Sequence, residues 1–524
     1  MPRDISEHPA ALAAREIVTT LAAQGVRDVV LAPGSRSAPL AYALHAAEQA
    51  GWLRVHVRID ERVAGFVALG IARERPAAVV TTSGTAVANL HPAVLEAHHS
   101  RLPLLVLSAD RPHELRGVGA NQTTDQPGIF GTAVRRSVEI PAFDGNPRGV
   151  TPTIVRAVAA AVGARTGIPG PVQVNIGFRD PLVPAQPWLP PAERPDAGPG
   201  VLPSGRPIGS VHPLHGSART VLVAGDGVGV AAAEIAEAGG WPLLAEPSSG
   251  ARRGATAIAG YHAALAELGA EIERVLVLGR PTLSRDISRL LARREIHQVV
   301  VDPAGDWVDV VGTADIIAPA LSVAESGDPG WLARWREAGT APDLGDGVTA
   351  ARVLRDVLSA RQPHPVVLGS SMTIRHADRA AGAGADYTAA RVLANRGLAG
   401  IDGTISTATG YALATGAPVR AVVGDLTFIH DVGGLAHGVH EPDVDLQVFV
   451  LNDAGGGIFA TLEHGRPEHA EVHPRFFGTA QDVDLAALAA GFGAAHLPVT
   501  TTAALAAVLA APVRGRSVVE IRLD

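Results

Sequence analysis

The sequence predicts an α/β protein with three doubly wound domains, each a parallel sheet covered by helices on both faces. Short apolar runs that end in glycine or polar residues alternate with longer segments of helical periodicity, the pattern of strands linked by crossover helices. A chain of 524 residues is too long for one ordinary core and suits about three domains. Hydrophobic residues make up 47% of the chain and aromatic residues only 4%, which favours closely packed helices on buried sheets.

The first region, predicted as a domain over residues 1–183, holds four segments typical of buried strands and the turns that follow them. They are DVVLAPGS (28–35), AAVVTTSGT (77–85), LPLLVLSADRP (102–112) and PVQVNI (171–176). In open parallel sheets ligands bind at the carboxyl ends of the strands, so these turns are candidate site segments.

A proline-rich stretch follows the first region and is predicted to be a linker over residues 184–217. A second α/β domain is predicted over 218–345, with strands in TVLVAGDGVG, RVLVLGRPTL and QVVVDPAGD. A third is predicted over 346–524, with strands in PVVLGS, RAVVGD, LQVFVLND and SVVEIRL. The first and third regions share a similar rhythm of strands and helices, which indicates two related sheets separated by another.

The GDGVG segment, Gly225 to Gly229, partly matches a dinucleotide-binding fingerprint. It lacks the third glycine at the required offset and a suitable acidic residue on a following strand. We interpret it as a tight strand-to-helix turn, with a noncatalytic nucleotide-binding protein as the alternative.

Charge and composition exclude several classes of function. The formal charge is −8 and there is no run of about five or more like charges, so neither nucleic acid nor an anionic membrane is an expected partner. The absence of cysteine excludes disulfides, thiolate metal sites and a cysteine nucleophile. The sequence has neither a signal-like apolar core near Met1 nor an uninterrupted apolar run of about 18 residues, so we expect a soluble cytoplasmic protein without membrane insertion.

Glu61 is expected at the start of a helix that follows the strand-like VHVRI segment. Apolar residues recur at helical spacing from Val63 to Ile71 and mark one face for burial. An acidic residue in a first helical turn is often only a favourable partner of the helix dipole. The alternative is a carboxyl group held against an apolar wall, where its charged form is disfavoured and it is suited to sharing a proton.

Two strand ends in the third region carry oxygen-bearing side chains. Gly424 and Asp425 close one strand, Asn452 and Asp453 close another, and Gly455 to Gly457 follow at once. Residues 426–451 suffice for a crossover between parallel strands, so the two ends are expected side by side. Such side chains with a glycine carbonyl suit Mg²⁺, which completes its shell with water and phosphates, while glycines let a diphosphate approach the backbone. Capping residues and turn glycines are the structural alternative.

This block resembles the diphosphate and metal motif of thiamine-diphosphate enzymes, which bind Mg²⁺ or Mn²⁺. The resemblance implies that Glu61 hydrogen-bonds the aminopyrimidine ring of the cofactor. It implies metal ligands among Asp425, Asn452, Asp453 and Gly455; an aspartate at 453 departs from the usual second asparagine, so both 452 and 453 remain possible. The implied cofactor-binding residues are Glu61, Gly424, Asp425, Asn452, Gly455, Gly456, Ile401 and Ile458, with Ile401 wedged beneath the cofactor.

Further motifs resemble the 2-succinyl-5-enolpyruvyl-6-hydroxy-3-cyclohexene-1-carboxylate synthase family of menaquinone biosynthesis. They are APGSRSAPL, IDERVAGF, TTSGTAVANL, SADRPHELRGVGANQTTDQPG and ANRGLAGIDGTISTATG, together with the GD to GGGIF block. The resemblance implies a transferase that decarboxylates 2-oxoglutarate on thiamine diphosphate and adds the resulting carbanion equivalent to isochorismate. Both substrates are dicarboxylates, which arginine forks pair with well.

The same resemblance assigns substrate roles to arginines beside predicted strand ends and to their neighbours. On the 2-oxoglutarate side it places Ser371, Arg375 and Arg396. On the isochorismate side it places Ser35, Arg36, Arg111, Asn121 and Gln122. Arg285 is a further candidate cation from the middle domain, and Ile458 and Phe459 are implied walls of the pocket. Glu61, Arg36 and Gln122 are the implied catalytic residues, whereas His98, His99, His430 and His437 receive no role.

The resemblance also implies a homodimer or homotetramer with active sites between subunits, because Glu61 and the metal motif lie on different domains. The nearest alternatives are another thiamine-diphosphate-dependent 2-oxoacid decarboxylase and an acetohydroxyacid synthase. An α/β oxidoreductase is a more distant one.

Overall fold

The structure is a computed structural model that describes residues 7–145, 147, 149–196, 211–216, 218–303, 308–339, 343–345, 347–380 and 391–523. The chain divides into two compact units. The first comprises Met1–Ser204, Asp402–Ala417 and His430–Val444, and the second comprises Gly205–Ile401, Pro418–Ile429 and Asp445–Asp524. Two segments from the predicted third region therefore cluster with the first.

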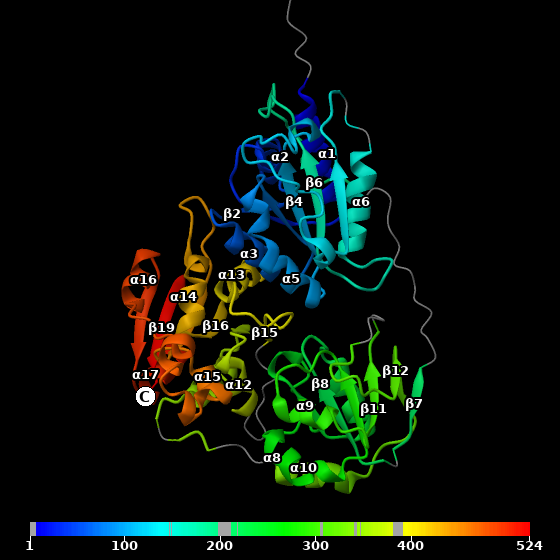
Figure 1. Cartoon of the computed structure of the whole chain (residues 1–524), viewed down its shortest axis with the longest axis vertical. Helices are drawn as coiled ribbons and strands as arrows, with labels where there is room; N and C mark the ends of the chain where they lie inside the picture. Colours follow the sequence, from blue (N-terminus) through cyan, green and yellow to red (C-terminus); the bar gives the residue numbers. More distant parts are fainter. Residues whose placement is uncertain are drawn as a thin grey trace, which may run out of the picture. The chain divides into compact units, whose positions relative to one another are not determined.

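A six-stranded, wholly parallel sheet forms the centre of the first unit (Figure 1). Its strand order is β2-β1-β3-β4-β6-β5. Its inner strands are buried on both faces, as expected of a parallel sheet between helices. The strands are β1 (Asp28–Leu31), β2 (Arg54–Val57), β3 (Ala77–Thr81), β4 (Leu104–Asp110), β5 (Arg136–Ile140) and β6 (Val172–Gly177).

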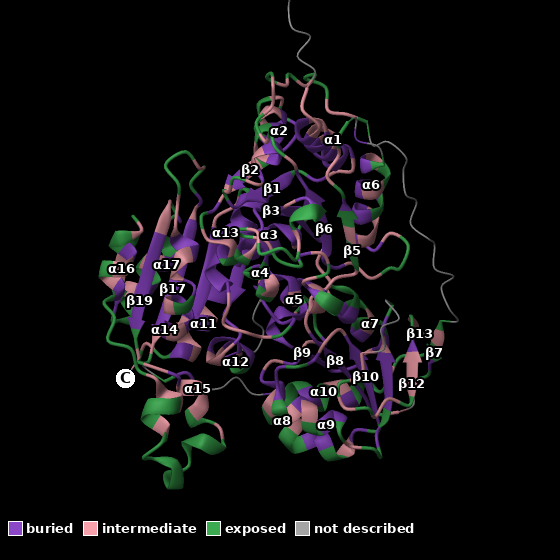
Figure 2. Cartoon of the chain, turned by 45° about the horizontal axis from the view of Figure 1, so that its top comes forward, coloured by how far each residue is buried: buried purple, intermediate pink, exposed green. Residues whose placement is uncertain are grey.

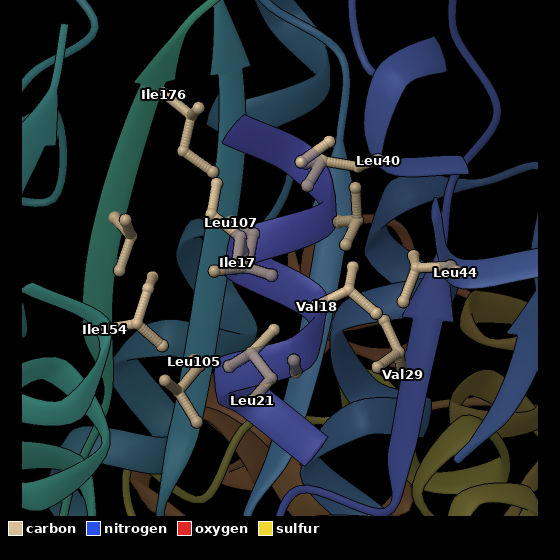
Figure 3. Close-up of a cluster of buried hydrophobic side chains, with 14 of the residues drawn as sticks. Ile17, Val18, Leu21, Val29, Leu40, Leu44, Leu105, Leu107, Ile154 and Ile176 are labelled. Atoms are coloured by element: carbon tan, nitrogen blue, oxygen red, sulfur yellow. The ribbon is translucent and has the colours of Figure 1, made fainter. Parts of the chain in front are cut away.

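Helices cover both faces of this sheet. On one face, Ile17, Val18 and Leu21 of α1 pack with Leu105 and Leu107 of β4 (Figure 3). On the other face, α3 packs against β1, β3 and α5. The helices are α1 (Pro9–Ala23), α2 (Ala38–Gln49), α3 (Glu61–Ala72), α4 (Thr85–Ala88), α5 (His91–His99), α6 (Val150–Ala161) and α13 (Thr404–Thr415), with short 3-10 helices at His113–Leu115, Gly131–Ala133 and Val432–Leu435.

Helix α3 is buried all round, and the prediction of a single buried face was wrong. All residues from Val63 to Ala72 are buried, because α13 packs on the side that the sheet leaves open. Glycines allow the two backbones to approach: a Cβ at Gly70 would lie 2.1 Å from the Thr407 carbonyl oxygen, and one at Gly410 would lie 2.0 Å from that of Val67. The surface α3 needs for burial therefore comes from more than 300 residues away in the sequence.

The second unit contains a five-stranded and a six-stranded parallel sheet. The five-stranded sheet has the order β12-β11-β10-β8-β9, with helices α8, α9 and α10 on one face and α7 on the other. Its elements are β8 (Thr220–Ala224), α7 (Ala231–Gly239), β9 (Leu243–Ala245), α8 (Tyr261–Leu268), β10 (Arg274–Leu278), α9 (Arg285–Leu291), β11 (His297–Val301), β12 (Ile316–Ala318) and α10 (Pro329–Ala338), with 3-10 helices at Pro247–Ser249 and Gly269–Glu271.

The six-stranded sheet of the second unit has the order β15-β14-β16-β17-β19-β18. If the strands of each six-stranded sheet are numbered separately along the chain, the two sheets have the same strand order. This agrees with the similar alternation of strands and helices in the first and third regions of the sequence. Its elements are α11 (Ala350–Leu358), β14 (Val366–Leu368), α12 (Met372–Arg379), β15 (Val392–Ala394), β16 (Val419–Gly424), α14 (Asp425–His430), β17 (Leu446–Asn452), α15 (Gly457–Ala460), α16 (Leu485–Gly491), β18 (Ala495–Val499), α17 (Thr502–Ala510) and β19 (Arg516–Arg522).

The prediction of three parallel-sheet α/β layers is confirmed, whereas the linker holds more structure than expected. Strand β7 (His212–Leu214) lies within the predicted linker 184–217 and pairs with β13 (Leu321–Val323). The two strands form a separate two-stranded sheet. Residues 197–210 and 217 of that linker lie outside the described residues, and the predicted domain boundaries stay predictions.

Burial follows the layers (Figure 2). The sheet strands are largely buried, and the short helical segments between Gly457 and Gly478 are largely exposed. No helix in the described ranges is long and apolar enough to cross a membrane.

The glycine contact between α3 and α13 predicts the effect of Gly410→Ala. The added methyl group would meet the Val67 backbone, which cannot move aside as a flexible side chain would. We expect the free energy of unfolding to fall by about 1 to 3 kcal/mol in denaturant titrations. Gly491→Ala at the end of α16 is the matched control, because no atom lies within 4 Å of its added Cβ. Equal stability of the two variants would contradict the packing argument.

Candidate functional site

Glu61 is the first residue of α3, as predicted, and follows the end of strand β2. Asp60 is the N-cap and accepts a hydrogen bond from the Arg62 backbone amide at 2.9 Å. The Asp60 carboxylate also binds the Arg62 guanidinium. Asp60 therefore caps the N-terminus of α3, and Glu61 is not needed for this role. The partly buried Glu61 carboxylate makes no hydrogen bond with the described residues and is available to a ligand.

Arg36 and Arg111 form a cationic pair at the carboxyl ends of β1 and β4. The Arg36 Nη1 donates to the Phe178 carbonyl oxygen at 2.9 Å, and Arg111 Nη1 donates to the Gln122 carbonyl oxygen at 3.0 Å. Burial and the nearby Arg36 charge lower the pKa of Arg111. The exposed Asp180 carboxylate lies 3.7 Å from Arg36, and the charges of Asp110 and Asp180 partly offset the lowering of the Arg111 pKa.

Ser83, after β3, is a member of this cluster that the sequence prediction missed. Its hydroxyl contacts Arg111 and donates to the Gln122 carbonyl oxygen at 3.0 Å. The Gln122 side-chain amide donates to the Ser83 carbonyl oxygen at 3.0 Å, and Gln122 has a φ of +54°. Ser35 and Asn121 are exposed beside Arg36 and Gln122 in the chain. The predicted isochorismate residues therefore lie at one edge of the first sheet.

A second cationic cluster lies in the second unit and brings together Arg375, Arg396 and Arg285. Burial, then the charges of Arg396 and Arg285, lower the pKa of Arg375. Arg375 Nη1 donates to the Ser371 carbonyl oxygen at 2.8 Å. Arg285 is largely exposed, and its nearest carboxylate oxygen, on Glu463, is 3.9 Å away.

Arg396 is almost fully buried and is hydrogen-bonded to a residue that follows β10 of the five-stranded sheet. Its Nη2 donates to the Thr282 hydroxyl at 3.1 Å, while Nε and Nη1 are buried without a hydrogen-bond partner in the described chain. The carboxyl group of Glu246 is also nearby, but burial raises its pKa to about 8, so it provides little negative charge at neutral pH. Neither Thr282 nor Glu246 was anticipated. Guanidinium groups that lie close together and have unpaired N–H donors form a site suited to an anion.

A cavity of about 280 Å³ adjoins this cluster at the carboxyl ends of β16 and β17. It holds the predicted acids and glycines as well as the predicted apolar walls. Its lining includes Ser371, His376, Ile401, Gly424, Asp425, Asp453, Gly455, Gly456, Ile458 and Phe459. His376 is an addition, and burial, with the Arg379 charge, lowers its pKa.

The two acids of the cavity raise each other's energy when both are ionised. Burial, followed by the charge of Asp453, raises the pKa of Asp425 to about 6, and burial also raises the pKa of Asp453. Hydrogen bonds from the backbone amides of Leu426 and Gly455 to Asp425 only partly offset this. A bound cation would relieve the repulsion, because an opposite charge favours the ionised form of both acids.

The backbone around this pair also suits a metal and a diphosphate. Gly455 has a φ of +148°, and a Cβ there would lie 2.4 Å from the Gly478 carbonyl oxygen, so a larger residue does not fit. A Cβ at Gly457 would lie 2.3 Å from an Asp453 carboxylate oxygen. The described residues contain no cluster of three histidine, cysteine or acidic side chains able to hold a metal ion. Two carboxylates and a carbonyl fit Mg²⁺, which keeps sites for water and phosphate.

Asn452 and Asp453 face different surroundings. Asp453 lines the cavity with Asp425, whereas Asn452 lines another cavity and donates from Nδ2 to Glu520 Oε1 at 3.1 Å. The geometry thus favours Asp453 over Asn452 as the partner of Asp425.

The remaining candidates lie away from these clusters or have local contacts. His98 Nδ1 lies 3.1 Å from the Ala133 carbonyl oxygen, and His430 Nε2 lies 4.0 Å from Asp402. The GDGVG segment forms the turn between β8 and α7, as expected. A Cβ at Gly225 would lie 2.1 Å from the Arg280 backbone, so this glycine is needed for packing.

The chain matches two family models. Residues 13–129 match the thiamine pyrophosphate enzyme N-terminal TPP binding domain, and residues 380–521 match the C-terminal TPP binding domain. It is 48% identical to the 2-succinyl-5-enolpyruvyl-6-hydroxy-3-cyclohexene-1-carboxylate synthase of Paenarthrobacter aurescens, over 98% of this chain and 94% of that protein. It is 47% identical to the synthase of the same name from Kineococcus radiotolerans, over 98% and 96%. It is 41% identical to the synthase of the same name from Rhodococcus erythropolis, over 99% of this chain and 97% of that protein.

The acid pair predicts a pH dependence of stability. The pKa of Asp425 is about 6 in the folded protein against 3.8 for an ordinary aspartate, so the folded state holds its proton more tightly. This stabilisation is complete below about pH 4 and is lost as the pH rises through about 6. Asp425→Asn cannot ionise, so at pH 7.5 it should raise the free energy of unfolding of the ligand-free protein by about 1 to 3 kcal/mol.

The test is urea titration at pH 4.5 and 7.5 without metal or cofactor. The gain from Asp425→Asn should shrink at the lower pH, and Asp482→Asn, at an exposed position, should give no gain at either. A variant less stable than the wild type at pH 7.5 would refute the repulsion between the two acids.

Proposed function

Because the chain belongs to the 2-succinyl-5-enolpyruvyl-6-hydroxy-3-cyclohexene-1-carboxylate synthase family of thiamine pyrophosphate enzymes, we propose that it catalyses the reaction of that name in menaquinone biosynthesis. The proposed substrates are 2-oxoglutarate and isochorismate, and the proposed cofactors are thiamine diphosphate (thiamine pyrophosphate) with Mg²⁺ or Mn²⁺. The enzyme would release carbon dioxide from the first substrate and join the four-carbon remainder to the second.

The cluster of Arg375, Arg396 and Arg285 is the observation that carries this proposal. Arg375 binds the carbonyl of Ser371, and Ser371 lines the cavity of the acid pair, so the cations adjoin the expected reaction centre. Three guanidinium groups with so little compensating charge suit a dicarboxylic oxo acid. Ser371, Arg375 and Arg396 would orient its carboxylates through bidentate hydrogen bonds.

Asp425, Asp453 and the Gly455 carbonyl would hold the metal, and Gly424 and Gly456 would border the diphosphate. Ile401 and Ile458 would pack on the apolar part of the cofactor, and Phe459 would help to exclude water. When bound, thiamine diphosphate supplies the carbanion chemistry that lets a 2-oxo acid lose carbon dioxide and transfer the remaining fragment.

Glu61 would exchange a proton with the ring nitrogen of the aminopyrimidine. The hydrogen bonds that Asp60 accepts from Arg62 support this role, because they cap α3 and leave the Glu61 carboxylate without a hydrogen bond among the described residues. The buried residues that follow, beginning with Val63, would exclude water from one side of that proton. A desolvated carboxyl group suits proton exchange with a weakly basic ring.

Arg36 and Arg111 would bind the carboxylates of isochorismate, with Gln122, Ser35 and Asn121 at its polar groups. Ser83 supports this arrangement, since it joins Arg111 to Gln122. Arg36 and Gln122 would then act on isochorismate, whereas Arg375 and Arg396 would act on 2-oxoglutarate. Arg285, whose charge lies near Arg375, would offer a further cation for a substrate carboxylate.

The decisive experiment measures carbon dioxide release from 2-oxoglutarate with Mg²⁺ and thiamine diphosphate, with and without isochorismate. We expect isochorismate to accelerate release and to be consumed in equal amount. Glu61→Gln should retain cofactor binding and lose about 100-fold or more in rate, as expected for a residue that transfers a proton. Carbon dioxide release at the same rate with and without isochorismate would instead indicate a simple decarboxylase. Absence of thiamine diphosphate binding would refute the proposal as a whole.

We also propose that the complete site forms between subunits of a homodimer or homotetramer. The presence of Glu61 and the acid pair on different compact units supports this arrangement. Mixing Glu61→Gln protein with Asp425→Asn protein, after exchange of subunits, should restore about one quarter of the wild-type activity, because half of the dimers are mixed and each has one intact site. Neither variant alone should show this activity, and no recovery after proven exchange would contradict a shared site.

A further inference from the structure

The side-chain amide of Asn452 connects strand β19 to the loop that follows β17. Its Nδ2 donates to Glu520 Oε1 at 3.1 Å, and its Oδ1 accepts from the Ala454 backbone amide at 3.2 Å. Asn452 is also fixed through its backbone, because the Leu523 amide donates to the Asn452 carbonyl oxygen at 2.9 Å. The amide therefore bridges a rigid strand and the start of the glycine loop.

Glu520 determines which way this amide faces. A carboxylate can only accept hydrogen bonds, so Asn452 must turn its NH₂ group toward Glu520 and its oxygen toward Ala454. Glu520 is buried and receives two further hydrogen bonds, from His496 Nε2 at 2.9 Å and Arg522 Nε at 3.1 Å. Burial alone would raise its pKa, but the hydrogen bonds from Arg522, Asn452 and His496 hold the pKa below its usual value.

Ala454 needs this support because its backbone is in the left-handed region, with a φ of +56°. Residues with a Cβ atom disfavour this conformation, whereas glycine adopts it readily. The hydrogen bond from Ala454 to Asn452 closes the turn that directs the next peptide back to the cavity. There the Gly455 amide binds the Asp425 carboxylate, and Asp453 faces Asp425.

We propose that Glu520 is a positioning residue of the diphosphate and metal site. It orients the Asn452 amide, which holds Ala454 in its left-handed conformation and so places Asp453 and Gly455 around the ion. This role rests on the proposed binding of thiamine diphosphate and a metal at Asp425 and Asp453. Glu520 would touch neither ligand, and its effect would pass entirely through the loop.

The test compares Glu520→Leu, Glu520→Gln and Ala454→Gly in the full-length protein. Affinity for thiamine diphosphate at saturating Mg²⁺ is measured by calorimetry, and amide hydrogen exchange over residues 453–457 is measured without ligands. Glu520→Leu should weaken the affinity about tenfold and speed exchange in the loop, as for other residues that orient metal ligands. Glu520→Gln should stay within about threefold of the wild type, because its amide oxygen can still accept from Asn452.

The double variant Glu520→Leu with Ala454→Gly distinguishes positioning from a general loss of stability. Glycine at 454 removes the conformational penalty, so most of the lost affinity should return, although Ala454→Gly alone should change it less than about threefold. Val499→Ala, in the neighbouring strand β18, is the control: it should lower the unfolding temperature and leave the affinity unchanged.

Wild-type affinity in Glu520→Leu, or no recovery in the double variant, would overturn the positioning role while leaving the proposed function intact. Failure of the wild-type protein itself to bind thiamine diphosphate with Mg²⁺ would overturn the proposed function and this role with it.

Discussion

Like charges held close together at the carboxyl ends of parallel strands are the constraint on which the site depends. Asp425 and Asp453 end neighbouring strands and raise each other's energy in a partly buried cavity. Positive charges likewise repel one another in the cluster of Arg375, Arg396 and Arg285. Such arrangements would relax in a flexible chain. They persist because each strand end is fixed by a sheet that is buried on both faces, so the energy of packing exceeds the repulsion.

The interior strands of the fold could be predicted from the sequence, whereas the edge strands could not, except for β2 in the VHVRI segment. Strands such as β4 and β17 lie between two neighbours and are buried on both faces, so each contains an uninterrupted apolar run, LLVL in β4 and VFVL in β17. Edge strand β5 is mostly exposed and β18 is mixed, and neither carries such a run. Pairing with one neighbour is enough to form an edge strand, and that partner is remote in the sequence.

The same distinction separates the site residues that were predicted from those that were missed. Glu61 lies just before an apolar helical segment, and Asp425 and Arg111 lie just after apolar strands, so their place at a strand or helix end is visible locally. Thr282 and Ser83 gain their importance only from the arginines they contact. Asn452 and Asp453 are adjacent polar residues, and only the position of Glu520 on another strand shows which way Asn452 faces.

The common strand order of the two six-stranded sheets explains how one fold supplies two different binding edges. In the first sheet the strand ends carry arginines and a helix that starts at Glu61. In its counterpart the corresponding edge carries the acid pair and glycines, together with Arg375 and Arg396 after β14 and β15. The backbone plan is the same, so the difference lies only in the few residues after each strand. A parallel sheet buried on both faces tolerates those changes because its stability comes from the apolar residues within the strands, several residues away from the charges.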